Sequence, residues 1–108
     1  KDACDRGLTD KMVVKVFNDR GSCLAVVKIT DNIMQGVVNI PTGAWLDPSI
    51  SDDISCVHGN PNVLTLDAGT SKLAQGPSSH TCLVEIEKYK KEPPNIMAFN
   101  PPKIIKSL

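Results

Sequence analysis

Polar and hydrophobic residues alternate most regularly between positions 81 and 87. The apolar face of this segment carries Cys82, Val84 and Ile86, and polar side chains occupy the positions between them apart from Leu83. A period of two residues is expected of a β-strand with one buried face. The pattern therefore predicts a half-buried strand over residues 81–87.

The first third of the chain predicts a β-hairpin. Residues 12–18 are rich in β-branched valine around Lys15, and residues 22–30 form a second apolar run. The intervening Asn18-Asp19-Arg20-Gly21 has turn composition, and we expect Gly21 to be free to take a positive φ. A further strand is predicted over residues 37–40, ended by Pro41.

Helical signals are confined to short segments. Residues 2–6 predict a helix that stops at Gly7, and Asp10-Lys11 predicts a turn. Residues 61–66 predict a helical turn, because Asn60 is a good N-cap and Pro61 suits the first helical position. Residues 70–74 predict another turn, ended by Gly76.

The remaining segments lack periodicity. Residues 41–60 form a long loop, and residues 90–108, which contain two Pro-Pro pairs, predict an extended tail that regular structure cannot continue through. Short strands joined by turns, with no long helix between them, are typical of a small β-barrel. The fold class is therefore mainly β.

The length and the charge balance of the chain limit the classes of function that it can have. A length of 108 residues fits one domain, and 12 basic residues balance 12 acidic ones. This balance gives no support for nucleic acid as a partner. No apolar run reaches the length of a membrane-spanning helix, so we expect no membrane insertion.

Four cysteines are present, at Cys4, Cys23, Cys56 and Cys82, and no pair has C-x-x-C spacing. This spacing argues against a zinc or iron–sulfur site. We interpret them as free thiols, with Cys23 and Cys82 buried in strand-like runs, while a disulfide stays open as the alternative. His58 and Asp52-Asp53 are interpreted as solvated loop residues, not metal ligands.

The most unusual segment is residues 59–76. It gathers many small polar side chains, Gly and Pro with few charges and few bulky apolar residues. Such a composition suits a large, flat ligand rich in nitrogen and oxygen, held by directed hydrogen bonds.

This segment also resembles a known family. Asn60-Pro61-Asn62 and Thr70-Ser71-Lys72-Leu73-Ala74-Gln75-Gly76 are similar to the C-terminal cofactor-binding domain of the dimethyl-sulfoxide reductase family of molybdenum enzymes, and most similar to its trimethylamine-N-oxide and biotin-sulfoxide reductase branch. The resemblance covers roughly residues 2–90. Further family-like stretches are Asp2-Ala3-Cys4-Asp5-Arg6-Gly7, Val16-Phe17-Asn18-Asp19-Arg20-Gly21, Gly43-Ala44-Trp45-Leu46-Asp47-Pro48 and His80-Thr81-Cys82-Leu83-Val84-Glu85.

The resemblance implies a specific fold and domain plan. The fold would be a six-stranded double-psi β-barrel with short helical turns. Residues 1–89 would form the molybdopterin-dinucleotide-binding barrel, and residues 90–108 its extended, Pro-rich C-terminal tail. Since the family's domain begins with an additional strand, we expect the barrel to be N-terminally truncated in this chain.

The resemblance also implies a function. The cofactor would be bis-molybdopterin guanine dinucleotide with molybdenum, bound within a bacterial enzyme that reduces an S-oxide or N-oxide such as biotin sulfoxide, dimethyl sulfoxide or trimethylamine N-oxide. Partners would be the other domains of that enzyme, the substrate and an unassigned electron donor, in the periplasm or the cytoplasm. No residue here is assigned as catalytic or as a metal ligand, and the isolated chain is expected to be inactive.

Two carboxamides are the leading site candidates. Asn62 and Gln75 each offer a donor and an acceptor that match the edge of a pterin or guanine, and both lie in the family-like segment. Ser79 and His80 fall in the same family region. For Asn62 and Gln75 the structural alternative is that each caps a turn.

Cationic and aromatic candidates complete the set. Thr70, Ser71 and Lys72 combine hydroxyls with a cation suited to phosphate, or else form a cap beside a solvated lysine. Arg20 is placed to approach the cofactor's phosphates, or belongs only to a hairpin turn. Trp45 either lines the cofactor's funnel or serves as a core or interdomain contact.

A second function class stays open from the sequence. The same barrel can be a non-enzymatic scaffold or protein-binding module that uses its polar loop for a protein partner. Cofactor loading separates the two classes, because only the first depends on the carboxamides of Asn62 and Gln75.

Overall fold

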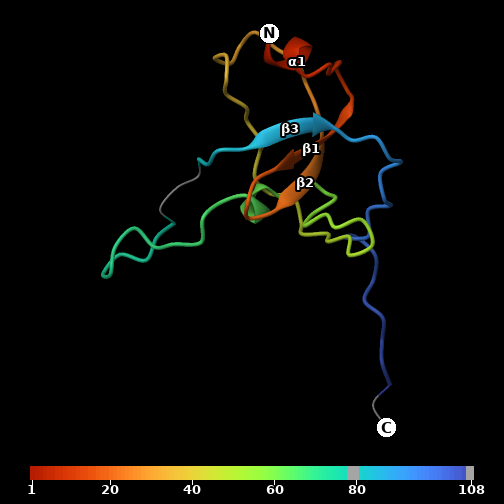
Figure 1. Ribbon diagram of the computed structural model, residues 1–108. Coiled ribbons are helices and arrows are strands. Elements are labelled where there is room, and N and C mark those ends of the chain that lie inside the picture. The colour runs from red at the N-terminus through yellow and green to blue at the C-terminus, as the bar shows by residue number, and fades with distance from the viewer. Residues whose placement is uncertain (78–80, 107–108) are drawn as a thin grey trace.

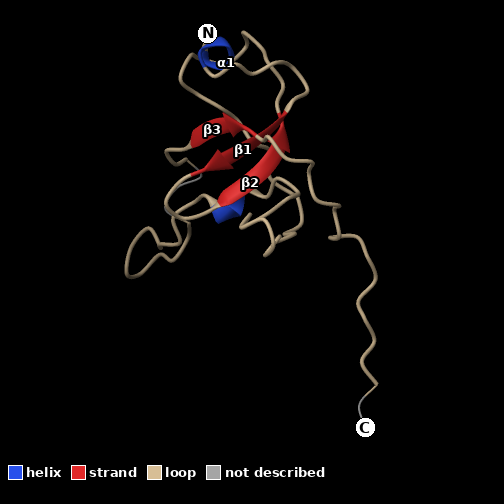
Figure 2. Cartoon of the chain, turned by 45° about the vertical axis from the view of Figure 1, so that its right-hand side comes forward, coloured by secondary structure: helices blue, strands red, loops and turns tan. Residues whose placement is uncertain are grey.

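The computed structural model describes residues 1–77 and 81–106. Its regular elements are helix α1 (Asp2–Asp5), strands β1 (Val13–Phe17) and β2 (Ser22–Val26), the 3-10 helix η1 (Pro61–Val63) and strand β3 (Glu85–Lys88). Long loops connect them, as Figures 1 and 2 show. The mainly β class is confirmed.

The three strands form one open antiparallel sheet in the order β2-β1-β3. β1 pairs with β2 from Val13↔Val26 to Phe17↔Ser22, which confirms the predicted hairpin. β3 pairs with the other edge of β1, from Val14↔Lys88 to Phe17↔Glu85. Six strands closed into a barrel are not seen among the described residues, whose sheet ends at β2 and β3.

Side chains on the two faces of the sheet pack into two small hydrophobic cores. Val14, Val16 and Cys23 pack with Leu8, Cys56 and Leu64 on one face. The predicted apolar face of Cys82, Val84 and Ile86 lies against this cluster, as expected. On the other face Leu24 packs with Ile54 and Val57.

Three predicted strands differ from the structure. The strand predicted over residues 22–30 ends at Val26. Residues 37–40 pair with no strand in the described part of the chain, and Val37 and Val38 are exposed there. Strand β3 begins at Glu85 instead of Thr81, because β1 ends opposite Glu85 and the preceding residues extend past it. Local β propensity cannot supply the neighbouring strand that a ladder requires.

Of the three short helical segments predicted, two are confirmed and one is wrong. Helix α1 ends before Gly7, which has a φ of 64°, as expected. Asn60 caps η1 by accepting a hydrogen bond from the backbone of Asn62, also as expected. The helical turn predicted over residues 70–74 is wrong: the Thr70 N–H donates to Gly76 O, which makes a chain reversal closed by a bridge between residues 69 and 77.

Gly21 has a role other than the one we expected. Its φ is not positive, so conformational freedom does not explain it. A Cβ built on Gly21 would lie 2.5 Å from the Val63 carbonyl oxygen and 2.9 Å from Ser55 Oγ. Glycine is therefore required because the β1–β2 turn lies directly against η1.

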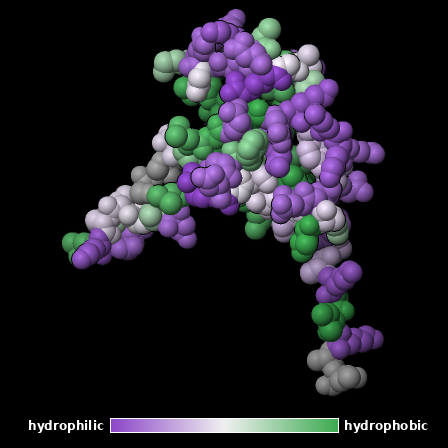
Figure 3. All heavy atoms as spheres, viewed as in Figure 1, coloured by the Kyte–Doolittle hydropathy of each residue, from purple (hydrophilic) through white to green (hydrophobic). Residues whose placement is uncertain are grey.

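Two segments extend away from the sheet in both ribbon views. We call residues 66–77 the arm, which projects to one side, and residues 100–106 run outward toward the C-terminus. Leu73 on the arm and Ile104 near the C-terminus are each more than nine-tenths exposed. Figure 3 shows such green patches on the arm and the tail, separate from the body.

Candidate functional site

The turn between β1 and β2 is organised by Asn18. Its Nδ2 donates to the carbonyl oxygens of Leu64 at 2.8 Å and Leu83 at 3.1 Å, while its Oδ1 accepts from the backbone N–H groups of Arg20 and Gly21. One side chain thus joins the turn, the end of η1 and the segment before β3. The sequence placed Asn18 only in a turn, because long-range partners leave no local signal.

The same turn fixes the position of Arg20. Its Nε donates to the Leu64 carbonyl oxygen at 2.8 Å, beside the bond from Asn18. Leu64 is only 2% exposed, so this acceptor is held by the core. The two terminal guanidinium nitrogens have no partner among the described residues. Arg20 therefore presents two free donor nitrogens, with four N–H groups, and a positive charge next to η1.

Asn62 lies in η1, two positions before the carbonyl that holds Arg20. Its backbone N–H is occupied by Asn60 Oδ1 at 2.9 Å, and its backbone oxygen accepts from Thr65. Its carboxamide is exposed and makes no hydrogen bond within the described residues. The fold thus brings a free carboxamide and a guanidinium from distant parts of the sequence onto one structural unit.

The arm carries four further predicted residues. Thr70 Oγ1 donates to Ala74 O at 2.7 Å, Ser71 Oγ accepts from the Ala74 N–H at 2.8 Å, and Gln75 Nε2 donates to the backbone oxygens of Ser71 and Lys72. These bonds hold the shape of the arm. Lys72 is exposed and forms no ion pair within the part of the chain that is described.

Trp45 belongs to a third group. Its indole ring lies 5.5 Å from the ring of Phe99, and its carbonyl oxygen lies 3.2 Å from His58 Nδ1. The ring of His58 meets Phe99 edge-on at 5.1 Å. The interpretation of His58 as a solvated residue was wrong, since the side chain is half-buried in this aromatic cluster.

The predicted site residues thus fall into three places. Arg20 and Asn62 share one unit, the arm holds Thr70, Ser71, Lys72 and Gln75, and Trp45 lies in the aromatic cluster. Ser79 and His80 lie outside the described residues. Within residues 1–77 and 81–106 no group of three or more His, Cys, Asp or Glu side chains is arranged to hold a metal ion.

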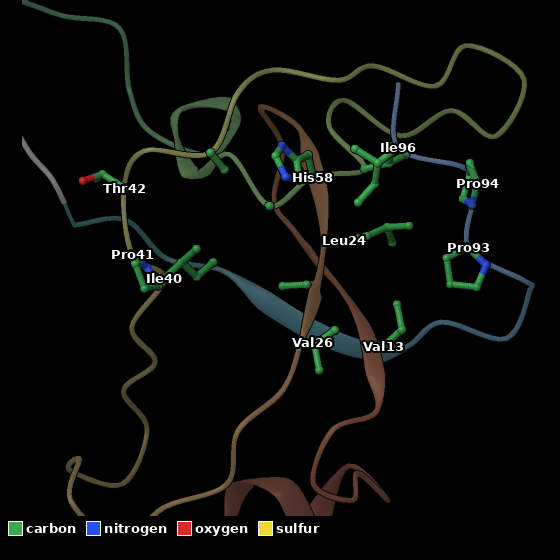
Figure 4. Close-up of a pocket in the computed structure, with 14 residues that line it drawn as sticks. Val13, Leu24, Val26, Ile40, Pro41, Thr42, His58, Pro93, Pro94 and Ile96 are labelled. Carbon is green, nitrogen blue, oxygen red and sulfur yellow. The ribbon is translucent and has the colours of Figure 1, made fainter. Parts of the chain in front are cut away.

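A groove of about 480 Å³ lies over β2 and the start of β1 and reaches His58 of the aromatic cluster (Figure 4). Its walls come from β2, the segment around Ile40 and Pro41, and the C-terminal residues Pro93, Pro94 and Ile96. The lining is mostly aliphatic and offers few hydrogen-bonding groups. This groove does not contain Arg20, Asn62 or the arm.

All four thiols are free, as the sequence predicted, and Cys23 and Cys56 are buried. Burial, with a smaller repulsion from Cys56, raises the pKa of the Cys23 thiol to about 11. Cys82 is half-buried and packs against the main core. A separate effect acts at Glu85, where a hydrogen bond from the Ile86 N–H and an ion pair with Arg6 lower the carboxyl pKa.

The raised pKa of Cys23 predicts an alkaline loss of stability. Folding favours the protonated thiol, so its contribution is complete below the ordinary pKa of 9.0 and is lost as the pH rises toward about 11. Urea unfolding at pH values across this window should show a steeper decline for the wild type than for Cys23→Ala. Equal slopes would contradict the raised pKa of Cys23.

In the folded chain, exposed Cys4 should react with a thiol reagent before Cys23.

Among the described residues no helix has the length and apolar character needed to cross a membrane.

The chain is similar in sequence to curated bacterial reductases. The chain is 51% identical over 104 residues to a trimethylamine-N-oxide reductase of Salmonella typhi, covering 94% of this chain and 12% of that protein. It is 49% identical over 88 residues to a biotin sulfoxide reductase of Cereibacter sphaeroides, covering 82% and 12%. A trimethylamine-N-oxide reductase of Vibrio cholerae is 44% identical over 103 residues, covering 94% and 12%.

The chain therefore spans about 12% of the length of these curated relatives. The family described as "Molydopterin dinucleotide binding domain" matches residues 1–83, which include β1, β2, η1 and the arm. The earlier resemblance is confirmed, and this chain belongs to the molybdopterin dinucleotide-binding domain family.

Proposed function

We propose that the chain is the cofactor-binding domain of a bacterial molybdenum oxidoreductase that reduces S-oxides or N-oxides. Family membership supports the cofactor class, and relatives named trimethylamine-N-oxide reductase and biotin sulfoxide reductase support the substrate class. The reaction would remove one oxygen atom from the substrate as water, consuming two electrons and two protons. When bound, the molybdenum cofactor supplies this oxygen-atom transfer, and the domain supplies binding and orientation.

The observation that carries the proposal is that Asn62 lies in η1 while Arg20 is held at the end of η1 by its hydrogen bond to Leu64 O. A free carboxamide can donate to and accept from the edge of a pterin or guanine. A guanidinium with two free nitrogens can bind phosphate in a bidentate manner. The donor set therefore fits a pterin dinucleotide, which joins a polar ring edge to phosphates. Bis-molybdopterin guanine dinucleotide with molybdenum is the cofactor that the proposal assigns.

The arm would extend this site. Lys72 offers a cation to phosphate, and the internal bonds of Thr70, Ser71 and Gln75 set the shape that presents it. Gln75 would contribute its carboxamide oxygen, for which no hydrogen bond is present in the described residues. Ser79, His80 and Trp45 complete the proposed contacts, with Trp45 lining the funnel above the cofactor.

We also infer that the sheet is one part of a six-stranded double-psi barrel. Strands β2 and β3 end the sheet; the outer side of β2 carries only a short parallel bridge from Cys23 to Cys56, and large apolar side chains such as Val26 and Leu83 are exposed beside the two strands. Further strands of the parent enzyme would pair with β3 and with the part of β2 beyond its bridge to Cys56. Residues 1–89 would then be the barrel and residues 90–108 the tail, and the parent's other domains would be the remaining partners.

Substitution of Arg20 tests the proposed phosphate contact. In the full-length protein, Arg20→Ala should lower the cofactor retained after gel filtration several-fold, because a bidentate cation is lost. Arg20→Lys should restore only part of it, since an ammonium lacks the planar pair of donors. The wild-type advantage should shrink at high salt, which screens charge attraction.

Lys28 provides the matched control. It is exposed and forms no ion pair in the described residues, so Lys28→Ala removes one positive charge without removing a contact. Cofactor retention in Lys28→Ala should equal that of the wild type. If Arg20→Ala also retains wild-type cofactor, Arg20 does not bind the phosphates and serves only the turn.

A further inference from the structure

Hydrogen bonds to Asp47 hold the C-terminal residues 97–99 against the loop of residues 41–60. One carboxylate oxygen, Asp47 Oδ2, accepts hydrogen bonds from two successive backbone groups, Met97 N–H at 2.6 Å and Ala98 N–H at 3.0 Å. Asp47 is 7% exposed and has no ion-pair partner among the described residues. A buried carboxylate needs such partners, so these two bonds account for its presence in the structure.

Hydrogen bonds to buried residues hold the backbone of Asp47 in place. The Asp47 N–H and the His58 N–H both point to Cys56 Sγ, each at 3.4 Å, and the Asp47 carbonyl oxygen accepts from Val57 N–H at 2.7 Å. Cys56 is fully buried. The backbone of Asp47 is therefore tied to the core, and its carboxylate points outward to the C-terminal segment from a fixed position.

The attached segment carries Phe99. The turn that follows the two bonds to Asp47 is closed by Asn100 N–H donating to Met97 O. Phe99 lies between the rings of Trp45 and His58, at 5.5 Å and 5.1 Å. On the N-terminal side of the same bonds, Ile96 forms part of the groove wall in Figure 4.

We propose that Asp47 is a positioning residue that sets the orientation of Trp45. By fastening residues 97–99, Asp47 places Phe99 against the Trp45 ring and limits the positions open to it. Asp47 touches no cofactor in this scheme and acts through Phe99. The consequence for cofactor binding rests on the proposed function, in which Trp45 lines the cofactor's funnel.

The two hydrogen bonds from Met97 and Ala98 to Asp47 are tested first, on the 108-residue chain without cofactor. In Asp47→Ala, amide hydrogen exchange at Met97 and Ala98 should become at least about tenfold faster, because both N–H groups lose their acceptor. The amides of Val14 and Val16 in β1 should keep their protection, which shows that the fold is intact. Asp47→Asn, which can place a neutral oxygen at the same position, should restore part of the protection.

The orientation of Trp45 is tested by its fluorescence. Trp45 is the only tryptophan in the chain, so emission reports this residue alone. Trp45 is 62% exposed with Phe99 beside it, so acrylamide quenching should rise modestly in Asp47→Ala, and Phe99→Ala should reproduce the rise. Asp31→Ala is the matched control, because Asp31 is exposed and makes no hydrogen bond in the described residues, and it should change neither quenching nor exchange.

The outcomes separate this proposal from the proposed function. Unchanged exchange at Met97 and Ala98, or unchanged quenching of Trp45, would overturn the role of Asp47 whatever the cofactor content. In the full-length protein, Asp47→Ala should lower retained pterin several-fold. A wild-type protein that binds no pterin would refute the proposed function, while the exchange and quenching results would still decide whether Asp47 positions Trp45.

Discussion

Gly21→Ala should lower the free energy of unfolding by about 3 kcal/mol, the upper end of the cost of overpacking. The added methyl would lie 2.5 Å from the Val63 carbonyl oxygen, and backbone atoms cannot rotate away as a flexible side chain can. The turn and η1 would have to separate, which would also strain the bonds from Asn18 and Arg20 to Leu64 O. Urea unfolding of the 108-residue chain measures the loss.

Gly76→Ala is the matched control for this prediction. A Cβ on Gly76 has no atom within 4 Å, and its φ is not in the left-handed region. Stability should stay within about 1 kcal/mol of the wild type, and a small gain is expected because alanine restricts the unfolded chain. If both alanine variants unfold at the same urea concentration, the close approach of the turn to η1 is not a requirement of the fold.

Replacing both carboxamides, Asn62→Ala with Gln75→Ala, should nearly abolish cofactor loading in the full-length protein. A polar ligand atom left buried without its partner costs about 1–3 kcal/mol, and two such losses weaken binding by roughly thirtyfold or more. Molybdenum and pterin content after purification is the measurement. If the chain is a non-enzymatic scaffold, replacing these two side chains should leave the metal and pterin content unchanged.

The single and control variants make this result specific. Asn62→Ala removes no side-chain hydrogen bond among the described residues, so thermal stability without cofactor should not change. Asn32→Ala with Gln35→Ala removes the same two residue types from an exposed turn, where neither side chain makes a hydrogen bond in the described structure. That control should load like the wild type. Normal loading of the Asn62 and Gln75 variant would exclude both residues from the cofactor site.

Local rules were enough to predict the elements whose partners are near in sequence. The β1–β2 hairpin, the stop of α1 at Gly7 and the Asn60 cap of η1 each depend on a few adjacent residues, and the structure contains all three. Residues 37–40 failed because a strand also needs a neighbour to pair with. Residues 70–74 failed because hydrogen bonds between the two limbs of the arm replaced those of a helical turn.

The candidate site shows the same division. From composition, Asn62 and Gln75 could bind a ligand or cap a turn, and the resemblance favoured the first; in the structure the Gln75 Nε2 does bind the backbone of the arm, while the Asn62 carboxamide makes no hydrogen bond in the described residues. Sequence could not show that Arg20 is held at the end of η1, the helix that contains Asn62, because the link passes through Leu64 O across more than 40 positions. Nor could it assign Asn18 and Asp47, whose partners lie 46 and 50 positions away.

Metal and pterin analysis of the full-length protein, purified from a molybdate-fed host, tests the central claim most directly. The cofactor assignment predicts about one molybdenum with about two pterin guanine dinucleotides per chain, since the bound cofactor carries the chemistry. That result would leave substrate choice as the next question. A well-folded full-length protein that contains neither molybdenum nor pterin would contradict the account.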